Sequence, residues 1–170
     1  MTAEQTYQLI SSYPDFELRD YAGCVMARVN VSGPFEAAGN NAFRPLFRYI
    51  SGTGQAMTAP VLLQPGQVPG TFDVSFVLPP GTRLDSAPVP EVPGVALLEV
   101  PQALQAASSY SGRWTQSSYE THATALEVAV RQAGFEPAGS PAFARYDPPY
   151  KPWFMRRNEV VLPVVHTNRA

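Results

Sequence analysis

The sequences Ser32-Gly33-Pro34-Phe35 and Ser111-Gly112-Arg113-Trp114 lie 79 positions apart, and each stands between a predicted strand and a predicted helix. At that offset Phe47 corresponds to Leu126. A single strand–strand–helix–strand–strand unit could not bury its sheet face alone, so two copies are expected to share one fold. The sequence therefore predicts an α+β fold: a duplicated unit forming a twisted antiparallel sheet or distorted barrel, flanked by two helices. The alternative is a chance resemblance within a two-helix α+β domain.

Patterns of apolar residues predict where the strands lie. Alternation of apolar and polar residues indicates half-buried strands, and short apolar runs between turn residues indicate buried ones. Proline-rich stretches in the middle of the chain are short, so they predict stiff loops within a single domain of residues 1–170, with repeats at about 7–80 and 83–166. The predicted strands are Phe16–Tyr21, Cys24–Val31, Pro60–Gln64, Phe72–Leu78, Val95–Pro101, a weaker one up to Tyr110, Ala142–Tyr146 and Glu159–Val165.

Two helices are predicted from apolar residues spaced three and four apart. The first is expected to begin at Pro34, to kink at Pro45 and to stop at Gly52. The second is expected to begin at the capping box of Ser117 and Glu120. The apolar positions of the first helix are Ala38, Ala42, Phe43, Leu46, Phe47 and Ile50.

Composition excludes several classes of function. The chain has 170 residues, 45% hydrophobic and 15% charged, with a net charge of −2 and a single cysteine, Cys24. This charge predicts no nucleic-acid partner, and one cysteine cannot form an internal disulfide. No apolar run is long enough for a membrane helix, and the N-terminus lacks the features of a signal peptide. A cytoplasmic protein without a membrane partner is therefore expected, and the sequence leaves a protein partner open.

Of the two histidines, His122 has two possible roles. It follows Tyr119 by three residues and precedes Leu126 by four, so it leans toward the apolar face of the second predicted helix. A histidine satisfied at the edge of the core is the favoured interpretation. An iron ligand is the alternative, if that face lines a cofactor cavity.

Two segments are richer in unusual residues than a plain fold requires: Met57–Val61 and Tyr146–Glu159. The second combines prolines, aromatic residues, a lysine and two arginines. This composition suits a flat aromatic ligand with carboxylates, because rings stack on rings and cations bind acids. In the alternative, Trp153 and its neighbour cover the core, and the arginines pair with Glu159 or Asp147.

At these segments the chain resembles the SOUL heme-binding protein family. The resemblance covers about Tyr7 to Val165. It implies a duplicated α+β fold, shared with bacterial effector-binding domains of the gyrase-inhibitor type. It also implies reversible, non-covalent binding of heme or a related tetrapyrrole, without a reaction. The matching pieces are Tyr49-Ile50-Ser51-Gly52, Met57-Thr58-Ala59-Pro60-Val61, Ser111-Gly112 with Trp114, and Tyr146–Glu159.

The resemblance places heme on the first helix and beside the loop before the last strand. It implies an apolar wall on that helix, and Lys151 as the lysine that pairs with a propionate. Asn40 stands where a heme-binding relative has an arginine, and Arg44 and Arg48 follow it as candidate replacements. The resemblance supplies no clear histidine ligand for the iron. The predicted heme-binding residues are Asn40, Phe43, Arg44, Leu46, Phe47, Lys151 and Trp153.

Three functions remain open at this point. The first is a cytosolic carrier or buffer of a tetrapyrrole or another flat apolar molecule. The second is an effector-binding or small-electrophile hydrolase domain using the same cavity, for which Glu17, Glu99 and Glu159 are candidate carboxylates. The third is a sensing domain whose ligand alters contacts with a separate protein.

Overall fold

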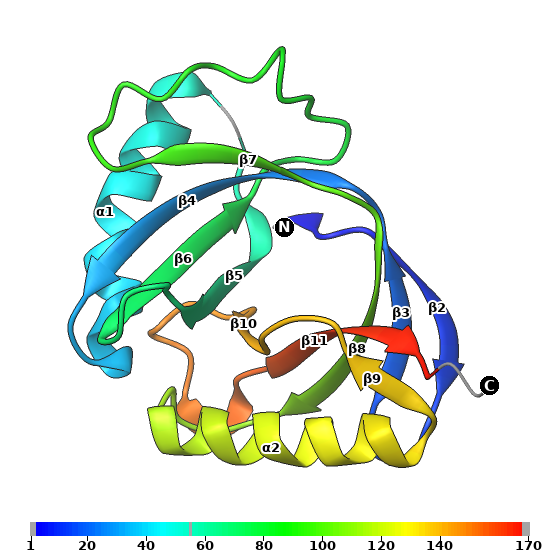
Figure 1. Ribbon diagram of the computed structural model, residues 1–170. Helices are drawn as coiled ribbons and strands as arrows, with labels where there is room; N and C mark the ends of the chain where they lie inside the picture. The colour runs from blue at the N-terminus through cyan, green and yellow to red at the C-terminus, as the bar shows by residue number, and fades with distance from the viewer. Residues whose placement is uncertain (1–2, 55, 168–170) are drawn as a thin grey trace. The chain divides into compact units, whose positions relative to one another are not determined.

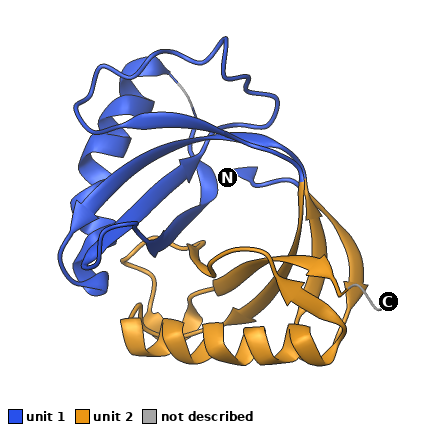
Figure 2. Ribbon diagram, viewed as in Figure 1, with its two compact units in different colours: residues 1–6, 22–102 blue, residues 7–21, 103–170 orange. Residues whose placement is uncertain are grey.

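The computed structural model describes residues 3–54 and 56–167 (Figure 1). The chain divides into two compact units that are interleaved along the sequence (Figure 2). Unit 1 comprises Met1–Thr6 and Ala22–Gln102, and unit 2 comprises Tyr7–Tyr21 and Ala103–Ala170. Each unit contains one α-helix and a set of mainly antiparallel strands, which confirms the predicted α+β fold. The single domain with repeats at 7–80 and 83–166 stays a prediction.

Unit 1 is a five-stranded arrangement with one helix. Its strand order is β1-β5-β6-β4-β7, in which only the short β1–β5 pair is parallel. The helix α1 packs against β4 and β6. Its elements are β1 (Ala3–Glu4), β4 (Cys24–Ser32), α1 (Phe35–Thr53), β5 (Thr58–Pro65), β6 (Thr71–Val77) and β7 (Ala96–Val100).

Unit 2 repeats this plan with antiparallel strands. Its strand order is β2-β3-β8-β11-β10, and β9 pairs with the end of β11. The helix α2 packs against β8, β9 and β11. Its elements are β2 (Tyr7–Ser12), β3 (Glu17–Tyr21), β8 (Ala103–Tyr110), α2 (Gln116–Gln132), β9 (Phe135–Pro137), β10 (Ala142–Arg145), the 3₁₀ helix η1 (Trp153–Met155) and β11 (Asn158–His166).

Helix α1 differs from its prediction at both ends. It begins at Phe35, with Pro34 as the residue before it, and continues through Pro45. It ends at Thr53, because Gly54 adopts a left-handed conformation with φ 72° that favours glycine. The predicted stop at Gly52 is therefore wrong by two residues, since Gly54, the second glycine of the Gly-Thr-Gly sequence, caps the helix.

Helix α2 is capped by Thr115, so the predicted capping box is wrong. The Thr115 side chain accepts a hydrogen bond from the Ser118 amide at 3.1 Å, whereas Ser117 already lies in the helix. The Ser-x-x-Glu spacing was misleading because Thr115, two residues earlier, is equally suited to cap a helix.

Replacing Thr115 by alanine is expected to lower the free energy of unfolding by about 1 kcal/mol, since an amide of the first turn loses its partner. Urea denaturation followed by circular dichroism measures this loss. Ser117→Ala is the matched control and is expected to change stability by less than about 0.5 kcal/mol. The reverse ranking would contradict the assignment of the cap.

Candidate functional site

Helix α1 presents two aromatic rings to solvent. Phe43 and Phe47 are each 45% exposed, and their rings stack with centroids 5.5 Å apart and planes 14° apart. Residues four apart lie one above the other on a helix, so the two rings form a continuous apolar strip. Phe43 also contacts the ring of Phe76 on β6, with centroids 5.9 Å apart. This strip, Phe43 and Phe47, is called the phenylalanine strip below.

The other predicted heme-binding residues of helix α1 do not lie on the phenylalanine strip. Leu46 is fully buried between the helix and the sheet of unit 1, so it supports the phenylalanine strip from beneath and does not line the surface. Asn40, Arg44 and Arg48 are exposed, and they follow one another at four-residue spacing along the helix. An apolar strip therefore lies beside a polar and cationic one.

The other predicted contacts, Lys151 and Trp153, belong to unit 2. The Lys151 Nζ lies 2.9 Å from Asp147 Oδ1, and the Arg157 amide donates to the other carboxylate oxygen. Burial raises the pKa of Asp147, but the bonds from Arg157 and Lys151 outweigh it and hold that pKa below its usual value. A ligand carboxylate at Lys151 would have to compete with Asp147.

Trp114 lies between two arginines of unit 2. The guanidinium carbons of Arg145 and Arg156 lie 3.6 and 4.0 Å from the centre of its ring. Two guanidiniums at these distances would overlap on one face, so they occupy opposite faces of the indole. The Trp114 Nε1 donates to Asn158 Oδ1 at 2.8 Å, and the Asn158 amide donates to Gly112 O at 3.0 Å. The start of β11 is thereby tied to the turn before α2.

The Nε of Arg145 is buried and has no hydrogen-bond partner among the described residues. Burial lowers its pKa to about 10, with a further contribution from the charge of Arg156. The side chain therefore keeps its positive charge at neutral pH. The Arg156 side chain donates to the carbonyls of Lys151 and Pro149, at 2.9 and 2.8 Å, and so holds the loop that precedes it.

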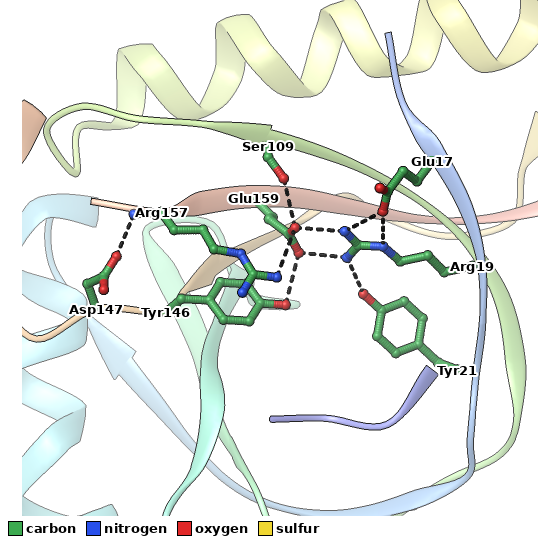
Figure 3. A network of polar contacts seen from close by, with 8 residues as sticks. All are labelled: Glu17, Arg19, Tyr21, Ser109, Tyr146, Asp147, Arg157 and Glu159. Atoms are coloured by element: carbon green, nitrogen blue, oxygen red, sulfur yellow. Dashed lines mark hydrogen bonds and ion pairs between the residues drawn. The ribbon is translucent and has the colours of Figure 1, made fainter. Parts of the chain in front are cut away.

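A buried ion pair occupies the interior of unit 2 (Figure 3). Arg19 on β3 donates two hydrogen bonds to the Glu159 carboxylate on β11, at 2.7 and 2.8 Å, and the two residues are 3% and 0% exposed. Ser109 and Tyr146 also donate to this carboxylate, at 2.8 and 2.9 Å. Arg157 lies 3.5 Å from it, which agrees with the alternative in which the arginines pair with Glu159 or Asp147.

These partners keep the Glu159 carboxylate ionised. Burial alone raises its pKa, but the hydrogen bonds and charge of Arg19, together with the two hydroxyl donors, lower it below the usual value. Tyr21 accepts a hydrogen bond from Arg19 at 2.8 Å, and burial raises its pKa to about 12. The arrangement therefore contains a fixed anion and a fixed cation and lacks a carboxyl group poised to donate a proton.

The other residues singled out in the sequence fall at separate places. His122 is half-buried on α2, where its Nδ1 donates to Ser118 O at 2.8 Å and its ring stacks on Tyr110, with centroids 3.7 Å apart. Glu17 contacts Arg19, and Glu99 is exposed on β7.

Within residues 3–54 and 56–167, no three His, Cys, Asp or Glu side chains gather as a metal site would require. No helix of this described part has the length and apolar character needed to cross a bilayer.

Three solved structures illustrate what this fold resembles. The C-terminal domain of EcmrR has 12% sequence identity and a TM-score of 0.67, with 95% of this chain and 99% of that one covered. A hydrolase from Listeria innocua has 11% identity and a TM-score of 0.62, with 96% and 94% covered. SAV2435 bound to tetraphenylphosphonium has 10% identity and a TM-score of 0.52, with 89% and 94% covered. At these identities the likeness shows the fold alone.

No curated protein matches the chain. A family model described as SOUL heme-binding protein matches residues 2–163, nearly the whole chain. The residues that it spans include the phenylalanine strip, the Tyr146–Glu159 loop and both arginine partners of Trp114. The chain belongs to the SOUL heme-binding protein family.

Proposed function

We propose that this protein binds heme or a related tetrapyrrole reversibly and non-covalently, as a carrier or buffer. The observation that carries the proposal is the phenylalanine strip of α1. Large apolar side chains that stack on each other in solvent offer a flat surface to a flat apolar ring. Family membership supports the same ligand class.

The charged neighbours of the strip fit the acid groups of such a ligand. Arg44 and Arg48 are exposed on the same helix as Phe43 and Phe47. A guanidinium binds a carboxylate through two parallel hydrogen bonds, so it can orient a propionate while the porphyrin ring covers the strip. Asn40 adds a polar group one turn earlier.

The residues present fit the porphyrin ring better than its iron. Helix α1 contains no histidine, cysteine or methionine that could ligate iron. His122, on α2 of unit 2, donates through Nδ1 to a carbonyl. Binding would then depend on apolar burial, at about 25 cal/mol per Å² before the cost of association.

We also propose that no reaction follows binding. A carboxyl that acts as a general acid at neutral pH needs a raised pKa. The buried carboxylate of unit 2 has the opposite property, because Arg19 holds the pKa of Glu159 down. A cytoplasmic location remains part of the proposal.

A hemin titration of the purified protein, followed by absorbance in the Soret region, tests the proposed function. A saturable spectral shift at about one hemin per chain is expected. A linear, non-saturating change would show only non-specific adsorption and would refute the proposal.

Lys151→Ala tests the contribution that the family resemblance assigns to unit 2. We expect hemin to bind about threefold more weakly, a size typical of a partly exposed ion pair, since Lys151 is already shared with Asp147. Binding of hemin dimethyl ester should not change, because its acid groups carry no charge. Arg83→Ala, which removes an exposed cation paired with Asp85, is the control. Equal weakening of both ligands would rule out a propionate contact.

A further inference from the structure

The loop between β10 and β11 exposes more large apolar side chains than any comparable stretch of the described chain. Tyr150, Trp153, Phe154 and Met155 are 88%, 46%, 61% and 58% exposed, and they lie within six consecutive residues. Single exposed apolar residues are ordinary, whereas a contiguous group marks a contact surface. Tyr150–Met155 is called the aromatic loop below.

The aromatic loop is held in place from behind. The Gly112 amide donates to Trp153 O at 3.1 Å, and the Met155 amide donates to Pro152 O at 2.9 Å within the 3₁₀ turn η1. The Arg156 side chain donates to the carbonyl of Lys151 in the loop and to that of Pro149 just before it. The loop therefore runs past the N-terminal end of α2 (Figure 1), and its exposed side chains are carried by a braced backbone.

Positive charge lies beside one of these rings and near the base of the loop. The guanidinium of Arg113 lies 4.9 Å from the centre of the Trp153 ring. Within the described chain, no carboxylate lies within ion-pair distance of Arg113, Arg145 or Arg156. Asp147 is the only acidic residue from 145 to 157, and it forms an ion pair with Lys151. A cationic patch thus adjoins the loop in a chain whose net charge is −2.

We propose that the aromatic loop docks this protein onto membrane surfaces that carry anionic lipids. Tryptophan, tyrosine and phenylalanine rings favour the zone between headgroups and acyl chains, and arginines beside them attract lipid phosphates. The side chains of the loop are exposed, as insertion into a lipid surface requires. The expectation of no membrane partner, which depended on the lack of a spanning segment, does not apply to such a peripheral contact.

The inference goes beyond tetrapyrrole binding and is testable without hemin. Phe154 and Met155 are outside the predicted heme-binding residues, and both are more than half exposed, so their replacement should leave folding intact. Sedimentation with vesicles of 30% phosphatidylserine in phosphatidylcholine, against pure phosphatidylcholine, measures partitioning. The Trp153 side chain reports insertion through quenching by brominated lipid.

The wild-type protein should partition at least tenfold more strongly onto the anionic vesicles, with quenching of tryptophan emission. Phe154→Ser/Met155→Ser should reduce that partitioning at least tenfold, and Arg113→Gln about threefold. Val89→Ser, which changes an 82% exposed side chain of unit 1, is the matched control and should have no effect. The melting temperature and hemin titration of each variant should match wild type.

Two results would overturn the inference. One is equal partitioning onto both vesicle types, or partitioning that Phe154→Ser/Met155→Ser leaves unchanged. The other is an absence of vesicle binding together with concentration-dependent self-association that this double variant abolishes. That second result would assign the aromatic loop to a contact between protein chains.

Discussion

Replacing Glu159 by glutamine is expected to lower the free energy of unfolding by about 3 to 5 kcal/mol. The substitution preserves shape but removes the buried counter-charge of the Arg19 guanidinium, which is 3% exposed and then keeps only the partly exposed Glu17 carboxylate, 2.8 Å away. Urea denaturation measures the loss. Glu99→Gln, on the exposed side of β7, is the control and should cost less than about 0.5 kcal/mol.

A double variant separates the buried charge from simple loss of contact. Arg19→Met/Glu159→Leu removes both charges and fills similar volumes, so it should be less destabilised than Glu159→Gln. A double variant that is the less stable of the two would contradict this account, because the ion pair would then stabilise the fold beyond the cost of burying it.

The same pair determines how acid affects stability. The folded pKa of Glu159 is lowered, so its contribution is fully present above its unfolded pKa of about 4.3 and is lost as the pH falls through the folded value. Wild type should therefore lose stability below about pH 4.3, and Glu159→Gln should lose less over that range. Parallel curves for the two proteins would show that Glu159 does not titrate with unfolding.

Removing both rings of the phenylalanine strip should have the largest effect on ligand binding. Phe43→Ala/Phe47→Ala is expected to raise the Kd for hemin about thirtyfold, equivalent to about 2 kcal/mol of lost apolar contact. The Soret titration measures it, at a temperature where circular dichroism shows the variant folded.

Val68→Ala is the matched control, because it shortens a 64% exposed apolar side chain elsewhere in unit 1. Its Kd should equal that of wild type. If the double phenylalanine variant also binds hemin as wild type does, helix α1 is not the ligand surface, whatever the affinity of the protein for tetrapyrroles.

The sequence predicted the helices and most strands because their apolar residues follow regular periods. The same pattern did not separate the two sides of α1. Ala42 and Leu46 face the sheet, whereas Phe43 and Phe47, one residue further on, are turned by about 100° and face solvent. The wide apolar stripe alone could not show that its phenylalanine edge remains uncovered.

The ion pair of unit 2 was missed for a different reason. The sequence predicted β3 as a half-buried strand, but Leu18 and Arg19, which point to opposite faces of it, are both buried. Glu159 was only one of three candidate carboxylates. Its partner lies 140 residues away in sequence, and pairing over that distance depends on strand order, which local patterns do not encode.

The loop before β11 shows both a success and a failure of sequence interpretation. Arg157 lies near Glu159, in agreement with the paired alternative, whereas Arg156 bonds carbonyls and stacks on Trp114. Trp153, which that alternative places over the core, is 46% exposed. Proline fixes the backbone of such a loop, and only the tertiary fold decides which way its rings face.

The placement of Trp114 and Trp153 has a spectroscopic consequence. They are the only two tryptophans of the chain, and both lie in unit 2 next to arginines. Intrinsic tryptophan emission is therefore blind to unit 1, including helix α1. Along one denaturation series, tryptophan emission reports the unfolding of unit 2, whereas far-ultraviolet circular dichroism reports the loss of secondary structure in both units. Coinciding midpoints would identify a single cooperative transition, and separated midpoints would resolve the order in which the units melt.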